Sequence, residues 1–136
     1  MTALFSRLGR YQDEALLILR IGLGAMMIVH GYPKLAGGPA MWKGIGGSMA
    51  AFGMHDFPQF WGFMAAFAEG VGGLLLVLGF FFRPACLLLI ITMIVAAMKH
   101  LDAGDGLGKA SHAIELGIVF LSLFIIGPGR YSIDKK

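Results

Sequence analysis

Charged residues are scarce in this chain: Asp, Glu, Lys and Arg make up only 14% of its 136 residues, against 57% hydrophobic residues and a mean hydropathy of +0.77. Soluble domains carry about 25% charged residues. So few charges exclude an ordinary water-soluble domain and indicate that lipid is the solvent. The 21 glycines and 9 methionines agree with this, because small residues let membrane helices approach closely.

Cysteine is nearly absent as well. The single Cys86 excludes an intramolecular disulfide, and without a CxxC pair the chain alone cannot perform dithiol redox chemistry. The net charge of +3 comes with no basic stripe, which excludes nucleic acid as a partner. No haem, flavin or iron–sulfur motif is visible. The first twelve residues lack the apolar core and cleavage site of a signal peptide, so we expect the first hydrophobic segment to be retained.

Four segments are long and apolar enough to cross a bilayer, which takes roughly 20 residues. We expect transmembrane helices over residues 14–35, 58–82, 84–101 and 109–126, in one domain covering residues 1–136. Between the first two spans, apolar residues recur at helical spacing at Trp42, Ile45, Met49 and Phe52. This pattern predicts a short helix on the membrane surface, the alternative being a plain Gly-rich connection. The expected fold class is all-α: an integral membrane four-helix bundle with a short interfacial helix.

An even number of spans places both ends of the chain on one side of the membrane. The basic residues expected on that side are Arg7, Arg10, Arg83, Arg130, Lys135 and Lys136. Those expected on the other side are Lys34, Lys43, Lys99 and Lys109. The positive-inside rule therefore predicts that both termini lie in the cytoplasm.

Ionisable residues inside membrane spans are costly and normally face a bundle interior or a wet cavity. Glu69 and Arg20 lie too far inside their spans to reach water easily. Small residues surround the face of Glu69, so we expect this carboxylate to point at another helix. The expected topology brings six further polar residues to the outer end of the bundle: His30, Lys34, Lys99, His100, His112 and Glu115. We predict that they share one outward-facing pocket with Glu69.

Each of these residues also has a plainer explanation. The lysines and histidines are typical of side chains that anchor a helix at the headgroup level. Glu115 is typical of a carboxylate favoured by the dipole near a helix N-terminus. The pair His112-x-x-Glu115 reverses the Glu-x-x-His order of di-metal bundles and has no second copy, so we predict no metal. Basic groups beside two carboxylates suit an anionic or carbonyl-bearing ligand better than a cation.

A quinone or quinol, or a small anionic substrate, is the ligand that this set of residues indicates. The predicted catalytic groups, which would handle protons, are Glu69, Glu115 and His100. The predicted binding groups are His30, Lys34, Arg20, His112 and Lys99, with Arg20 and Lys34 balancing the carboxylates.

The same residues give the chain a resemblance to the DoxX family of small four-helix membrane proteins. The segments that carry it are LLILRIGLGAMMIVHGYPKL, AEGVGGLLLVLGFFFRPA, MIVAAMKH and SHAIELGIVFLSLFIIGPGRYSID, which cover nearly the whole chain. The resemblance implies a bacterial inner-membrane protein of four helices. It does not imply one reaction, because members of the family differ in function. The family takes its name from a membrane subunit linked to a thiosulfate:quinone oxidoreductase, and other members are associated with thiol and oxidative-stress defence. Distant relatives act as cargo receptors or assembly chaperones.

Three functions therefore stay open at the level of the sequence. The first is a membrane redox component that takes electrons from a membrane or periplasmic redox partner or from a small anion. The second is a non-enzymatic scaffold or chaperone subunit of a larger complex, in which the buried charges hold the bundle together. The third is a small transporter or channel, which no inverted repeat or broken span supports. The sequence does not decide whether the chain is an enzyme or whether it forms a homo-oligomer.

Overall fold

The computed structural model describes residues 4–134, and this part of the chain is helical with no strand. Its elements in order are η1 (Ser6–Tyr11), α1 (Gln12–Ala36), α2 (Gly38–Gly46), η2 (Gly47–Phe52), α3 (Pro58–Leu78), α4 (Phe82–Asp102) and α5 (Leu107–Ile126). Four stretches of these described residues are long and apolar enough to cross a membrane: Ser6–Ala36, Pro58–Leu78, Phe82–Asp102 and Leu107–Ile126. The expected fold class, an all-helical membrane bundle, is confirmed.

The helix boundaries lie within two residues of those expected, except at the turn between the second and third spans. The second span ends at Leu78 and not at residue 82, because Gly79 takes a left-handed conformation at φ 67° that closes the helix. The third span then begins at Phe82, two residues before Pro84. Between them Phe81 also has a positive φ, of 46°, so the chain reverses within three residues. The tight α3–α4 turn places the start of α4 directly beside the end of α3.

Helices α1 and α3 pack backbone against backbone along a seam of glycines. A methyl group on Gly31 would overlap the backbone of Gly70, and one on Gly24 would overlap the carbonyl oxygen of Gly73. Small residues at such a seam let membrane helices approach closely enough for van der Waals contact between backbones. The face of α1 predicted from helical spacing is confirmed, since its buried residues are Arg20, Gly24, Met27 and Gly31.

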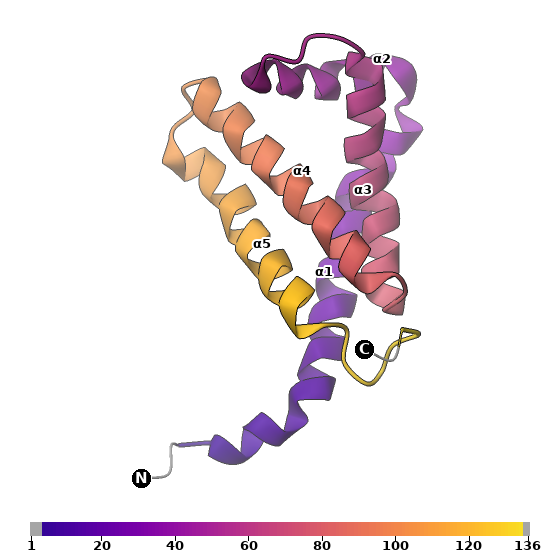
Figure 1. The fold of residues 1–136 in the computed structure, drawn as a ribbon, viewed down its shortest axis with the longest axis vertical. Helices are drawn as coiled ribbons and strands as arrows, with labels where there is room; N and C mark the ends of the chain where they lie inside the picture. The colour runs from indigo at the N-terminus through magenta and orange to yellow at the C-terminus, as the bar shows by residue number, and fades with distance from the viewer. Residues whose placement is uncertain (1–3, 135–136) are drawn as a thin grey trace.

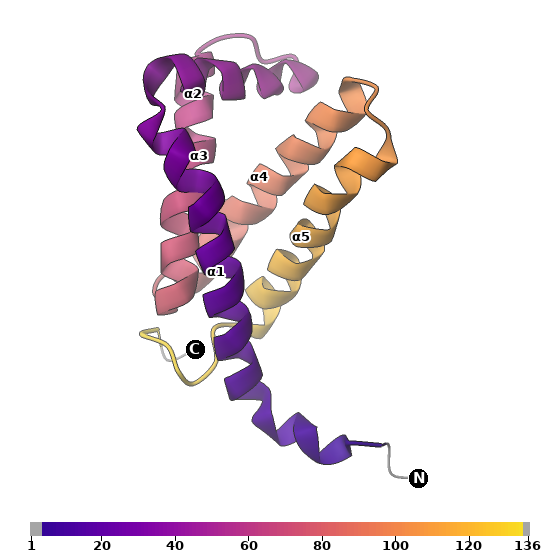
Figure 2. The same cartoon turned by 180° about the vertical axis from the view of Figure 1, so that it is seen from behind.

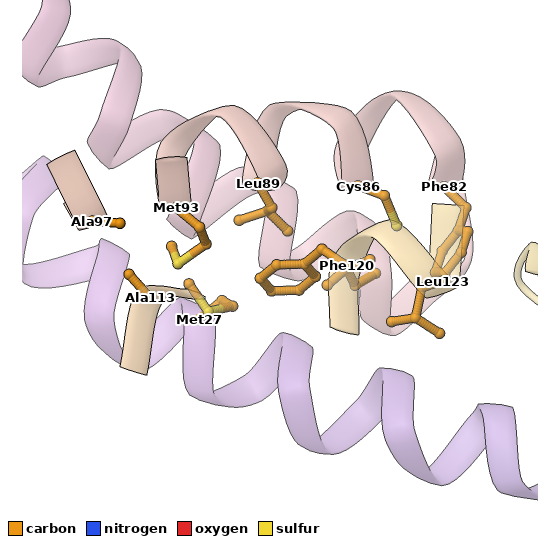
Figure 3. Packing of buried hydrophobic residues seen from close by; sticks show 10 residues of the cluster. Met27, Phe82, Cys86, Leu89, Met93, Ala97, Ala113, Phe120 and Leu123 are labelled. Atoms are coloured by element: carbon orange, nitrogen blue, oxygen red, sulfur yellow. The ribbon is translucent and has the colours of Figure 1, made fainter. Parts of the chain in front are cut away.

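Helices α4 and α5 form a second pair that leans away from the first. Both views show the α4–α5 hairpin close to α1 and α3 at the end where the described chain starts and stops, and diverging from them toward the end where α2 lies (Figure 1 and Figure 2). We call these the terminal end and the pocket end. The apolar core lies between the pairs and contains Met27 of α1, with Phe82, Cys86, Leu89 and Met93 of α4 and Phe120 and Leu123 of α5 (Figure 3).

The connection between α1 and α3 crosses the pocket end as a helical segment. It consists of α2 followed by the 3-10 helix η2, so the expected short helix is present but is α-helical only as far as Gly46. A methyl group on Gly46 would overlap the carbonyl of Pro58, and one on Gly62 would overlap the carbonyl of Trp42. These close approaches fix α2 across the first turns of α3. The connection is therefore a firmly packed roof over the pocket end.

The terminal end is tied together by residues 127–134, which follow α5. Asp134 accepts hydrogen bonds from the amides of Phe81 and Phe82, at 3.0 and 2.7 Å, and so caps the start of α4. Arg83, in the first turn of α4, donates a hydrogen bond to the carbonyl of Phe124 at 3.0 Å and so joins the start of α4 to the end of α5. The amide of Arg130 donates to Asp13 at 3.0 Å. The tail thus connects the ends of all four long helices.

Candidate functional site

A cavity of about 570 Å³ opens at the pocket end, between α3 and α4 and beneath the α2–η2 roof. Its walls are mostly apolar, with Ile45 and Met49 from the roof, Phe60, Trp61, Met64, Ala65 and Ala68 from α3, and Leu88, Ile91, Val95 and Ala96 from α4. Its polar groups are few: Lys34, Ser48, Glu69, Thr92, Lys99 and His100. An apolar cavity with a few convergent polar groups is the usual form of a small-molecule site.

Glu69 is the central carboxylate of this cavity. It is only 6% exposed, and its Oε2 accepts a hydrogen bond from Lys34 Nζ at 2.8 Å. The expectation that Glu69 points at another helix is therefore met, because Lys34 belongs to α1. Trp42 holds the end of α1 in place by donating its indole N–H to the carbonyl of Lys34 at 2.9 Å. The pair brings one negative and one positive group to the same wall of the cavity.

His100 lines the cavity from the last turn of α4. Its Nδ1 lies 2.9 Å from Asp105 Oδ2, in the loop between α4 and α5. This hydrogen bond, reinforced by the positive charges of Lys109 and Lys99, holds the pKa of Asp105 below its usual value. A carboxylate bound to one ring nitrogen of a histidine fixes the orientation of the ring and leaves the other nitrogen for a ligand. Lys99 also lines the cavity, so α4 contributes two basic side chains.

Arg20 does not belong to this site, although it shares a helix face with Lys34. It is 1% exposed at the terminal end, where its guanidinium donates to four carbonyl oxygens, those of Leu76 at 3.0 Å, Val77 at 3.0 Å, Pro128 at 2.9 Å and Tyr131 at 2.8 Å. Two of these carbonyls belong to the last turn of α3, whose dipole favours a cation. The expectation that Arg20 balances the carboxylates of the pocket is therefore corrected. It ties α1, α3 and the tail together.

Three more predicted residues lie outside the cavity. His30 is exposed on the outer face of α1, and His112 and Glu115 are exposed on α5. None of the three is among the residues that line the cavity. The reason is that α5 packs on α4 and not on α3, so α5 presents these side chains away from the bundle. The structure thus gathers Glu69, Lys34, Lys99 and His100, and leaves His30, His112, Glu115 and Arg20 apart from them.

Three residues that the sequence analysis did not single out contribute to the site. Trp61 and Thr92 face it from α3 and α4, and Asp105 supports His100 from behind. A signal for Asp105 does exist in the sequence, since an acidic residue five positions after a histidine at a helix end lies within reach of it. Nothing in the sequence distinguishes Trp61 from the other aromatic residues of the spans.

Within residues 4–134, no three His, Cys, Asp or Glu side chains gather in an arrangement that could hold a metal ion. Cys86 is fully buried in the core, near the terminal end, and has no part in the cavity.

Comparison with known proteins agrees with this architecture. The sequence model of the DoxX family matches residues 15–101, which contain all of α2 and α3, α1 from its fourth residue onward, and α4 except its last residue, Asp102. The chain belongs to the DoxX family. It is 32% identical over 136 aligned residues to inner membrane protein YphA of Escherichia coli K12, an alignment that covers 94% of each protein. It is 30% identical over 129 residues to inner membrane protein YqjF of the same organism, covering 93% of this chain and 94% of that one. No solved structure matches.

All the groups that the structure gathers at the cavity, apart from Asp105, fall inside the matched DoxX region. Lys34, Glu69, Lys99 and His100 lie between residues 15 and 101, whereas His112 and Glu115 lie beyond it. The part of the chain that identifies the family therefore also builds the cavity.

Proposed function

We propose that this DoxX protein binds the head group of a quinone or quinol in the cavity, as the membrane component of a quinone-linked redox system. The observation that carries the proposal is the combination of an apolar cavity of about 570 Å³ with a few ionisable groups, Glu69, Lys34 and His100 among them. The volume falls within the range of about 300–1,000 Å³ typical of small-molecule sites.

The cavity suits a ligand with both a polar ring and an apolar tail. Its walls between α3 and α4 include Phe60 and Ile91, which are 52% and 51% exposed and so face the surroundings of the bundle. In a membrane those surroundings are lipid, so a tail can leave the cavity between these two helices while the ring stays inside. A small free anion would gain nothing from such walls, which favours the quinone over the anion.

The polar groups fit the chemistry of a quinone ring. Its carbonyl oxygens accept hydrogen bonds, and the Lys34 ammonium and a histidine N–H are donors. Reduction to the quinol takes up two protons with two electrons, and Glu69 and His100 are side chains that can hold or release a proton. Asp105 links His100 to the aqueous side of the α4–α5 loop. The electrons are proposed to come from a separate membrane or periplasmic redox protein, or from a small reduced anion.

The positive-inside rule supports an orientation with the terminal end in the cytoplasm. By sequence, six basic residues belong to that side, against four on the other: Arg7, Arg10, Arg83, Arg130, Lys135 and Lys136 against Lys34, Lys43, Lys99 and Lys109. In this orientation the cavity opens toward the outer half of the membrane. The two E. coli relatives are named inner membrane proteins, which agrees with a location in a bacterial inner membrane.

Binding can be measured through tryptophan fluorescence, because the chain has only two tryptophans and only Trp61 lines the cavity. The protein in lipid nanodiscs is titrated with a short-chain ubiquinone and a short-chain menaquinone, both of which quench tryptophan. We expect saturable quenching that is lost in Trp61→Phe but retained, at equal or lower apparent affinity, in Trp42→Phe, which keeps Trp61 and loses only the hydrogen bond to the Lys34 carbonyl. Glu69→Gln is expected to weaken the apparent affinity by about tenfold or more, since a buried polar contact is lost.

The control for Glu69→Gln is Asp56→Asn, an exposed carboxylate of the loop before α3 that does not line the cavity. Quenching that never saturates, or that is the same in Trp61→Phe and Trp42→Phe, would sink the proposal. If no quinone binds and Glu69→Gln lowers only the thermal stability, the scaffold function is the one that remains.

A further inference from the structure

Helix α5 presents a carboxylate to the outside of the bundle in the middle of a span. Glu115 is the ninth of the 20 residues of α5, about 12 Å along a helix about 30 Å long. It is exposed, as is His112 one turn earlier. Neither side chain makes a hydrogen bond or an ion pair with any residue in the described range 4–134. An ionisable residue facing lipid at this depth is costly, so such residues are normally covered by protein.

The residues around Glu115 form a narrow surface suited to another helix. At 100° per residue, the α5 positions within roughly 60° of Glu115 run along its whole length. They are Gly108, Ser111, His112, Ile118, Val119, Ser122 and Ile126, which we call the α5 outer face. Three of these are small, and small residues at an interface let two membrane helices come close. The hydroxyls of Ser111 and Ser122 donate to the carbonyls of Gly108 and Ile118 of their own helix, so they can be covered without a new partner.

We propose that the α5 outer face packs against the same face of a second copy of this chain, in a dimer whose two-fold axis is parallel to the membrane normal. Two copies inserted in the same membrane have the same orientation, so their α5 helices run parallel and their residues lie at matching depths. Glu115 of one copy then lies opposite the partner's α5, with the partner's His112 only about 4.5 Å higher along the axis. The imidazole donates a hydrogen bond to the carboxylate, and the two-fold repeats the contact.

Self-complementarity is what identifies the occupant as a second copy. The face carries one acceptor, Glu115, and one donor, His112, three residues apart, and a two-fold axis pairs each with the other. Helix α5 contributes nothing to the walls of the cavity, so the dimer leaves the cavity open to its ligand. The proposal is therefore independent of the quinone and can fail or succeed without it.

Cysteine cross-linking tests the contact directly. In Ser122→Cys the new thiols lie near the centre of the α5 outer face, whereas in Leu121→Cys they lie on the same helix at the same depth but roughly 100° away. The native Cys86 is fully buried and is the same in both variants. With a lipid-soluble oxidant in native membranes, we expect Ser122→Cys to form a disulfide-linked dimer at least about tenfold faster than Leu121→Cys, because only the first pair of thiols lies between the helices.

The role of the carboxylate is tested by mass measurements on protein in detergent or nanodiscs. We expect the unaltered chain to have the mass of two copies, and Glu115→Leu to have a dimer-to-monomer ratio about tenfold lower, because the polar contact across the interface is lost. Circular dichroism and thermal unfolding show whether each variant is still folded. A single-copy mass for the unaltered chain, or equal cross-linking of Ser122→Cys and Leu121→Cys, would overturn the proposal, and in that case another protein or lipid covers Glu115.

Discussion

The backbone of Gly31 in α1 rests directly on the backbone of Gly70 in α3, with no space for a side chain between them. Replacing Gly31 with alanine forces the two helices apart at the level of the Lys34–Glu69 pair. We expect Gly31→Ala to lower the free energy of unfolding by about 1–3 kcal/mol, the usual cost of overpacking. Thermal unfolding in detergent, followed by circular dichroism, measures the loss.

A matched control for this prediction lies on the same helix. Gly22 is exposed, and a methyl group there would meet no atom within 4 Å beyond its chain neighbours and the nearby backbone of its own helix. Gly22→Ala is therefore expected to be neutral or slightly stabilising, since alanine favours a helix more than glycine does. Equal losses in the two variants would mean that the glycine seam does not determine the packing of α1 on α3.

Arg20 provides a second prediction, about the terminal end. Its guanidinium satisfies four carbonyl oxygens on α3 and the tail, and a buried carbonyl left without a partner costs about 1–3 kcal/mol. We expect Arg20→Met to lower the free energy of unfolding by about 3 kcal/mol or more. Arg20→Lys should recover only part of it, because an ammonium lacks the planar fork of donors. Arg10→Met is the control, since Arg10 is exposed and, within residues 4–134, its hydrogen bond and ring contact are with its neighbour Tyr11.

The Lys34–Glu69 pair is expected to stabilise the bundle as well as to bind a ligand. The side chain of Glu69 is 8% exposed and that of Lys34 is 33% exposed, so water screens the pair on one side only. We expect Lys34→Met and Glu69→Gln each to cost about 1–3 kcal/mol, less than a fully buried pair would lose. The double variant should cost less than the sum of the two, and a double-mutant cycle measures that coupling. Strict additivity would show that the two groups do not stabilise each other.

Asp105 gives a prediction about pH. The hydrogen bond from His100 lowers the pKa of Asp105. A carboxyl whose pKa is lower in the folded than in the unfolded chain stabilises the fold at pH values above its unfolded pKa, and this contribution is lost as the pH falls through the folded pKa. Carboxyl-carbon NMR titration should show that the pKa of Asp105 rises toward its usual value in His100→Gln. An unchanged titration in that variant would assign the lowered pKa to Lys109 and Lys99 instead.

Much of the fold follows from patterns visible in the sequence. The spans follow from hydropathy, and the buried face of α1 follows from the spacing of Arg20, Gly24, Met27 and Gly31. The small residues around Glu69 indicate that it faces another helix, and the structure supplies Lys34 as the partner. These inferences succeed because the lipid solvent leaves each helix with only one face that can be buried, and small or ionisable residues mark it.

The site was harder to predict, because residues that share a helix face need not share a depth. Arg20 and Lys34 lie on one face of α1 but are about 21 Å apart along its axis, so they belong to opposite ends of the bundle. Glu115 and His112 share a depth with the cavity but lie on the outer face of α5, and only the packing of α5 on α4 decides that. The four backbone partners of Arg20 come from segments more than 50 residues away, which no local pattern reveals.

The cap that Asp134 places on α4 has a consequence for how the protein is made. Asp134 is translated after all four long helices, yet it satisfies the amides of Phe81 and Phe82 at the α3–α4 turn. During membrane insertion, the two amides of that turn lack their hydrogen bonds to Asp134 until the tail has been synthesised and has folded back. Membrane insertion and final closure of the bundle are therefore separate events, and a chain truncated just before Asp134 would keep all four long helices but lack the carboxylate that joins the tail to α4.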